Sequence, residues 1–136
     1  MAGSATILFI EDDHFISEMY CRSLRQAGYT VDEAATGPKG IAAAREGKYD
    51  LILLDIFIPE KTGIEVLHEL REDDGSGLPE TKIVIMTNYS QDNQSRQALS
   101  SQADGYFIKA EVTPRKLVQL VEKLLGPTEA EKTQPA

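Results

Sequence analysis

Short apolar runs alternate with amphipathic segments along most of the 136-residue chain. The runs typical of strands cover residues 5–10, 50–55, 82–87 and 105–109, and a half-polar strand is expected at 29–34. Successive strand–helix units of this kind predict a parallel sheet with helices on both faces, because right-handed crossovers return the chain to the same end of the sheet. We therefore expect a single doubly wound, five-stranded α/β domain.

Amphipathic segments fill the intervals between the predicted strands, and their apolar residues recur with helical spacing. The predicted helices are 14–27, 37–47, a segment marked by Ile64, Leu67 and Leu70, 91–102 and 113–125. The segment 91–102 has few apolar side chains to bury, whereas 113–125 is strongly amphipathic. We assign residues 1–126 to the domain and expect the polar stretch 127–136 to be a disordered C-terminal tail or linker.

Charge and composition argue against two classes of function, nucleic-acid binding and membrane contact. The formal net charge is −8 and the pI is about 4.7. Such a surface repels phosphate backbones, so we expect no direct binding to nucleic acid. The chain has no apolar run near the ~20 residues that span a bilayer, so we expect no membrane contact. The single cysteine, Cys21, is interpreted as a buried apolar residue, which favours a cytoplasmic location.

Polar residues stand where the predicted strands end. Glu11 and Asp12 follow the first strand, and Asp55 ends the apolar run at 50–55. The fourth strand ends at Thr87 and the fifth at Lys109. Carboxyl ends of parallel strands meet at one edge of the sheet, where ligands of such folds bind. The pattern therefore predicts one site that contains carboxylates, a hydroxyl and an ammonium group.

These residue types favour phosphoryl chemistry that uses a divalent cation. Clustered carboxylates repel one another unless a cation or proton neutralises them. A small set of oxygen ligands with room for water favours Mg²⁺ over Ca²⁺. A carboxylate such as Asp55 is also a possible nucleophile toward phosphorus, and Thr87 and Lys109 are suited to contact the transferred group. Taken singly, each residue also has an ordinary structural interpretation, such as capping a helix.

Four segments together carry a family resemblance. They are "ILFIEDD", "DLILLDIFIPEKTG", "IVIMTN" and "GYFIK". Each is weak alone, but their order and spacing are specific. Over about residues 5–125 the chain resembles the receiver domain of bacterial two-component response regulators. The resemblance implies a flavodoxin-like fold with strand order 2-1-3-4-5.

The resemblance also implies roles for the residues at the strand ends. Asp55 matches the phosphoacceptor. Asp12 is similar to the direct Mg²⁺ ligand, and Glu11 to the acid that holds the metal mainly through water. The third protein ligand of the family is a main-chain carbonyl two residues after the phosphoacceptor, which corresponds to Phe57.

Three further positions match the family's switch. Thr87 matches the hydroxyl that closes on the phosphoryl group, Lys109 the lysine that pairs with it, and Tyr106 the aromatic residue whose rotation reports activation. Two neighbours depart from the pattern. Ala110 replaces the usual Pro after the lysine, so we expect a trans bond there. Asn88 replaces a smaller residue and is expected to restrict access to the site.

The implied function is a phosphorelay switch. The resemblance implies a histidine kinase or histidine phosphotransfer protein as phosphodonor. It also implies a downstream protein partner on the 91–125 face, and a monomer or weak dimer. The chain would catalyse only its own phosphorylation and dephosphorylation, so we do not expect a conventional enzyme.

Two other classes of function stay open at this point. A phosphatase of the haloacid-dehalogenase type also uses a strand-end Asp as its nucleophile. That family has a second Asp two residues later, where this chain has Phe57. The other class is an interaction module with the receiver fold that does not use phosphate. Such a module would need neither the acid pair nor Thr87 and Lys109.

Overall fold

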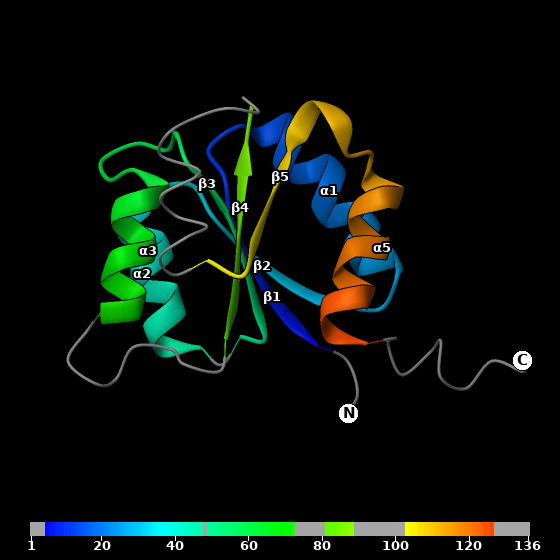
Figure 1. The fold of residues 1–136 in the computed structure, drawn as a ribbon, viewed down its shortest axis with the longest axis horizontal. Helices are drawn as coiled ribbons and strands as arrows, with labels where there is room; N and C mark the ends of the chain where they lie inside the picture. Colours follow the sequence, from blue (N-terminus) through cyan, green and yellow to red (C-terminus); the bar gives the residue numbers. More distant parts are fainter. Residues whose placement is uncertain (1–4, 48, 73–80, 89–102, 127–136) are drawn as a thin grey trace, which may run out of the picture.

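A parallel sheet with strand order β2-β1-β3-β4-β5 forms the centre of the molecule (Figure 1). The structure is a computed structural model and describes residues 5–47, 49–72, 81–88 and 103–126. Its strands are β1 (Thr6–Ile10), β2 (Thr30–Ala34), β3 (Leu51–Asp55), β4 (Lys82–Thr87) and β5 (Gly105–Ile108). The predicted fold class and strand order are confirmed. The segments predicted as a helix (91–102) and as a tail (127–136) lie outside the described residues.

Helices cover both faces of the sheet (Figure 1). They are α1 (His14–Gln26), α2 (Gly37–Glu46), α3 (Gly63–Glu72) and α5 (Pro114–Leu125), with a short 3₁₀ helix, η1, at Lys109–Glu111. The pair α1 and α5 packs on one face, and the pair α2 and α3 packs on the other. None of the helices in the described ranges is long and apolar enough to cross a membrane.

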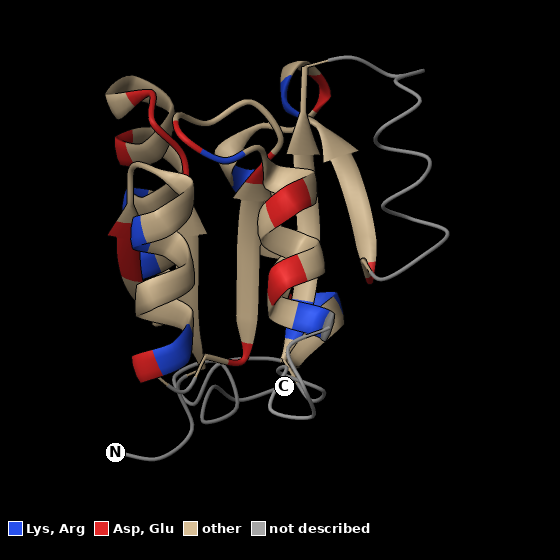
Figure 2. Cartoon of the chain, turned by 90° about the vertical axis from the view of Figure 1, so that its left-hand side faces the viewer, with Lys and Arg blue, Asp and Glu red and all other residues tan. Residues whose placement is uncertain are grey.

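Strand β3 shows how the sequence divides the core into two layers. All five of its residues are buried, as expected for a central strand covered on both faces. Leu51 and Leu53 face the layer of α1 and α5, whereas Ile52 and Leu54 face the layer of α2 and α3. In Figure 2 the charged residues lie mainly on the helices, on the outer strand β2 and at the ends of the sheet. Asp55, the last residue of β3, is the one charged residue of this strand.

The buried face of α1 differs from the simplest interpretation of its sequence. Phe15 and Met19 belong to the apolar pattern that predicts this helix, yet they are 86% and 46% exposed. The buried stripe instead consists of Ser17, Tyr20, Cys21 and Leu24. These positions are spaced by three and four residues and lie opposite Phe15 on a helix of 3.6 residues per turn. Cys21 is buried, as expected.

Strand β5 is one residue shorter than predicted. Lys109 begins η1 instead of ending the strand, and the main-chain N–H of Val112 donates to its carbonyl. Thr113 then caps α5 by accepting from the N–H of Lys116. No cis peptide bond occurs in the described residues, so the Lys109–Ala110 bond is trans, as expected. The turn places the Lys109 side chain at the carboxyl edge of the sheet.

Candidate functional site

Three carboxylates gather at the carboxyl edge of the sheet. Glu11 follows β1, Asp12 is the next residue, and Asp55 is the last residue of β3. One oxygen from each of the three lies within 4.8 Å of the others. Glu11 and Asp55 are 4% and 3% exposed, whereas Asp12 is exposed. The cluster therefore has a buried base and one side open to solvent.

The loop between β3 and α3 holds Asp55 in place. The N–H of Gly63 donates to the carbonyl of Ile56 at 2.7 Å. A Cβ atom at Gly63 would come within 2.3 Å of the Asp55 carbonyl oxygen, so only glycine allows this approach. The same loop contains Glu60, whose φ of +73° is a backbone conformation that residues other than Gly and Asn rarely adopt. Phe57 lies in this loop with its side chain half exposed.

Lys109 joins the two buried acids from the opposite side. Its Nζ lies 2.7 Å from Oε1 of Glu11 and 3.1 Å from Oδ2 of Asp55. The three side chains are at most 7% exposed, so water screens these pairs much less than pairs at the surface. The ammonium group neutralises one of the two carboxylates and leaves a net negative charge for a further cation.

The surroundings of Glu11 change the pKa of its carboxyl group, mainly through burial. Burial raises the pKa of Glu11 to about 7, and the charge of Asp55 adds to the rise, although the hydrogen bond from Lys109 opposes it. For Lys109, burial alone would lower the pKa of the ammonium group. The hydrogen bond to Glu11 and the charge of Asp55 outweigh burial and raise its pKa. Near neutral pH the metal-free site therefore holds a proton in part at Glu11.

Thr87 and Tyr106 lie on neighbouring strands beside the acids. Thr87 is fully buried at the end of β4, one residue past Met86, which pairs with Asp55. Tyr106 on β5 is 37% exposed and pairs with Ile85, two residues before Thr87. Side chains two residues apart on a strand share a face of the sheet, so Thr87 and Tyr106 are diagonal neighbours on one face.

Two residues that support the site were not predicted. The hydroxyl of Tyr20 lies within hydrogen-bond distance of the main-chain carbonyls of Lys109 and Val112, so it anchors η1 to α1. Asp13 caps α1 through its side chain, while its N–H donates to Oε2 of Glu11 at 3.2 Å. For Tyr20 one signal was available, because a tyrosine in the buried stripe of a helix requires a partner for its hydroxyl.

The arrangement combines a nucleophilic carboxylate, an oxygen-rich cation site, a hydroxyl and an ammonium group in one place. The carboxyl edge of a doubly wound sheet is also where such folds bind ligands. Together these features are those of a receiver domain with an acidic pocket. The family model for the response regulator receiver domain matches residues 7–122, and the chain belongs to this family.

Individual relatives agree with this family assignment. The chain is 34% identical over 119 residues to the transcriptional regulatory protein ResD of Bacillus subtilis, which covers 88% of this chain and 47% of that protein. It therefore spans about half the length of this curated relative. A CheY-like receiver domain protein from Methanospirillum hungatei is 31% identical, with a TM-score of 0.77 over 96% of this chain and 99% of that one.

A third structure shares the fold. The receiver domain of sensor histidine kinase PA1611 from Pseudomonas aeruginosa has a TM-score of 0.79 and 23% identity. The similarity covers 90% of this chain and 98% of that one. That domain was solved with a magnesium ion coordinated in its active-site cleft.

Proposed function

We propose that this chain is a phosphorelay switch that accepts a phosphoryl group on Asp55. The donor would be a phosphohistidine of a partner histidine kinase or histidine phosphotransfer protein. The observation that carries the proposal is the position of Asp55. Its carboxylate is buried at the carboxyl edge, 3.1 Å from the Lys109 ammonium group and within the cluster of three acids.

The transfer is an exchange of one bond for another. An oxygen of Asp55 forms a bond to phosphorus as the bond between phosphorus and the partner's histidine nitrogen breaks, and the imidazole leaves with the electron pair. The transition state spreads negative charge over the phosphoryl oxygens. The Lys109 ammonium group at the start of η1 already lies 3.1 Å from Asp55, so it would contact these oxygens with little reorganisation, and the Thr87 hydroxyl at the end of β4 would join it.

The donor atoms fit Mg²⁺. The proposed ligands are the carboxylates of Glu11, Asp12 and Asp55 and the main-chain carbonyl of Phe57. All are oxygens, and the exposure of Asp12 leaves room for the waters that Mg²⁺ usually keeps. Glu11 and Asp55 share the single ammonium group of Lys109, so with both acids ionised the buried part of the site has one negative charge in excess. When bound, Mg²⁺ would neutralise phosphoryl oxygens during transfer.

Phosphorylation would act on the rest of the domain through Thr87 and Tyr106. The added phosphoryl group brings about −1.5 to −2 charges to a site that is already anionic. Thr87 and Lys109 would move toward that charge. Tyr106 is the diagonal neighbour of Thr87, so an inward turn of its ring would fill the space that Thr87 leaves. The 91–125 face would then change its affinity for a downstream protein.

The direct test is intact-mass analysis after treatment with acetyl phosphate. With Mg²⁺ the wild-type chain should gain the mass of one phosphoryl group, and without Mg²⁺ the gain should be much slower. Asp55→Asn should gain nothing, because an amide is not a nucleophile of this kind. A matched control is Asp13→Asn, which keeps the cap on α1 and should gain the same mass as wild type.

Two results would favour the other functions. A wild-type chain that gains no phosphate, with or without Mg²⁺, would indicate an interaction module that does not use phosphate. Rapid turnover of a generic phosphate ester would indicate a phosphatase instead. Equal gains by Asp55→Asn and wild type would show that the acceptor is a different residue.

A further inference from the structure

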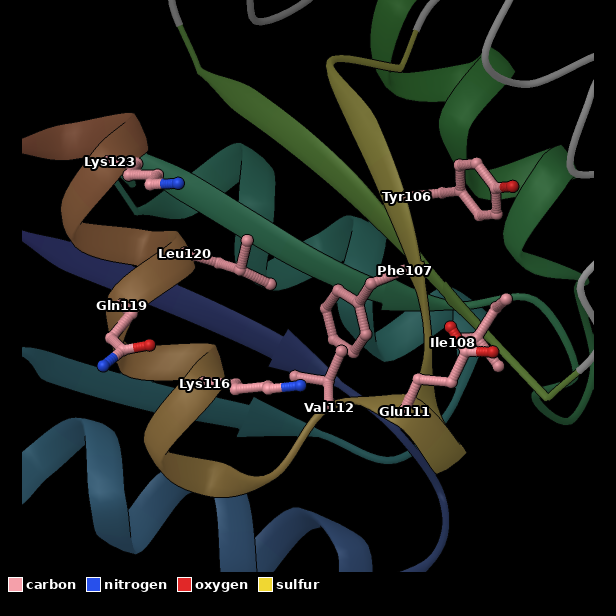
Figure 3. Close-up of a pocket in the computed structure, with 9 residues that line it drawn as sticks. All are labelled: Tyr106, Phe107, Ile108, Glu111, Val112, Lys116, Gln119, Leu120 and Lys123. Atoms are coloured by element: carbon pink, nitrogen blue, oxygen red, sulfur yellow. The ribbon is translucent and has the colours of Figure 1, made fainter.

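The seam between β5 and α5 contains a hollow lined by apolar side chains. Its volume is about 220 Å³, and its lining includes Leu53, Val84, Leu117, Val121 and Leu124. A shallower groove of about 520 Å³ adjoins it and shares Tyr106, Phe107, Leu120 and Lys123 with its wall. Figure 3 shows Phe107, Val112 and Leu120 on the α5 side of β5. A dry cavity of about 150 Å³ accommodates benzene, so this hollow has room for one large apolar side chain.

Gly105 explains why the hollow exists. Leu53, Val84 and Gly105 are paired in register across β3, β4 and β5. Leu53 and Val84 fill their positions beneath α5, but the third position has no side chain. A Cβ atom built on Gly105 meets no other atom within 4 Å. Neither a close approach nor a positive φ therefore requires glycine here, and its effect is to leave an opening in the apolar layer.

The groove beside the hollow is basic in a chain that is acidic overall. Most basic side chains of the described residues form ion pairs with acids. Five do not, and three of these five are on α5; the five are Lys39, Lys82, Arg115, Lys116 and Lys123. Lys116 and Lys123 are exposed and line the groove at two places along α5, with Glu111 as the acid among its lining residues. In a chain of net charge −8, this face is suited to an acidic partner.

We propose that the β5–α5 groove binds an acidic segment of the downstream partner protein, which inserts one large apolar side chain into the hollow beside Gly105. The acids of that segment would pair with Lys116 and Lys123. This inference specifies the partner of the output face and therefore rests on the proposed function. Tyr106 is a lining residue of the groove and the diagonal neighbour of Thr87, so phosphorylation at Asp55 would alter the affinity for the segment through this pair.

The test uses the full chain and a random-peptide display library, with and without acetyl phosphate and Mg²⁺. The selected peptides should contain a large apolar residue flanked by Asp or Glu. Synthetic copies of them should bind in a fluorescence-anisotropy titration, and added salt should weaken binding because exposed charge pairs are screened.

Two variants examine the hollow and the charges separately. Gly105→Met fills the hollow and should weaken binding of the selected peptides by about tenfold or more, as expected for a lost central anchor. Lys116→Glu combined with Lys123→Glu should weaken it by about tenfold, since each exposed pair contributes modestly. The control is Lys39→Glu, an exposed and unpaired lysine on α2, which should bind as wild type does. Thermal unfolding confirms that each variant is folded.

Several results would overturn the inference. They are a selected set without enrichment in acids, unchanged binding by both groove variants, or displacement of the peptides by random-sequence DNA. A change in oligomeric state caused by Gly105→Met would instead assign the groove to a second copy of the chain. Intact-mass analysis of the wild-type chain separates the two proposals. If the wild-type chain gains phosphate normally but binds no acidic peptide, the groove inference fails and the proposed function stands.

Discussion

The ammonium group of Lys109 lies 2.7 Å from Oε1 of Glu11, although the two residues are 98 positions apart in the chain. This bond ties the turn after β5 to the end of β1 across the carboxyl edge of the sheet. Because both side chains are buried, the pair depends on the protonation of Glu11. The metal-free protein should therefore respond to pH in a way that ordinary surface acids do not produce.

Stability without metal should fall as the pH rises from about 5 to 8. Burial raises the pKa of Glu11 from 4.5 to about 7, so the folded chain binds more protons than the unfolded chain between these values. The contribution is present at low pH and is lost as the pH passes the folded pKa, and the total loss in unfolding free energy is about 3 kcal/mol. Urea unfolding in EDTA measures it. Glu11→Gln should remove most of this dependence, and an unchanged pH profile in that variant would contradict the assignment.

Mg²⁺ should raise the melting temperature of the wild-type chain. A ligand that binds only the folded state adds about 1.4 kcal/mol when its concentration is ten times Kd. Differential scanning fluorimetry at millimolar Mg²⁺ measures the shift. Asp12→Ala should abolish it, whereas Asp13→Asn should keep it, because Asp13 serves α1 as a cap. If Asp12→Ala and wild type gain equally, the stabilising ion binds elsewhere.

Replacing Glu60 by Gly should stabilise the protein. Glu60 has a φ of +73°, which costs a residue with a side chain about 1–2 kcal/mol. Glycine removes that cost but loses about 0.5–1 kcal/mol through the greater freedom of the unfolded chain. The expected net gain in unfolding free energy is therefore about 0.5–1 kcal/mol in chemical denaturation. Glu60→Val is the opposite control, since a β-branched residue should be less stable than Glu here. A loss on Glu60→Gly would mean that the Glu60 side chain contributes contacts that outweigh the strain.

A beryllofluoride mimic of the phosphoryl group, added with Mg²⁺, should shift backbone NMR resonances over 87–92, 98–109 and the start of α5. The reason is the diagonal placement of Thr87 and Tyr106 on β4 and β5. An inward turn of the Tyr106 ring would gain about 1–2 kcal/mol of apolar burial, enough to bias two states that differ by a few kcal/mol. Resonances of α1 beyond its first turn should stay nearly unchanged. Shifts confined to Glu11, Asp12, Asp55 and their neighbours would show that the domain binds the mimic without transmitting a change.

The sequence predicts the fold well because its local signals agree with one another. Four strands of this sheet are short apolar runs and the outer strand β2 is half polar, while β3 begins after Asp50 and ends at Asp55. Once the sheet is parallel, strand ends must share an edge, so Glu11, Asp12 and Asp55 are brought together by topology alone. That is why the acid cluster was predictable without any knowledge of side-chain contacts.

Other features depend on contacts that a linear pattern does not contain. Phe15 and Met19 belong to the same apolar pattern as Tyr20 and Leu24. Only the packed structure decides which of them face the core, and Tyr20 and Leu24 do. The bond between Lys109 and Glu11 requires the turn at η1, which the prediction of a longer strand had missed. The hollow beside Gly105 arises from the register of three strands, and the sequence of any one strand does not contain this register.

The central claim is that Asp55 carries the phosphoryl group, and reductive trapping tests it most directly. Sodium borohydride reduces an aspartyl phosphate to homoserine, which tandem mass spectrometry locates within a peptide. After treatment with acetyl phosphate and Mg²⁺, the account predicts homoserine at position 55 and at no other aspartate. Homoserine at Asp12, at Asp13 or elsewhere, with Asp55 intact, would contradict it.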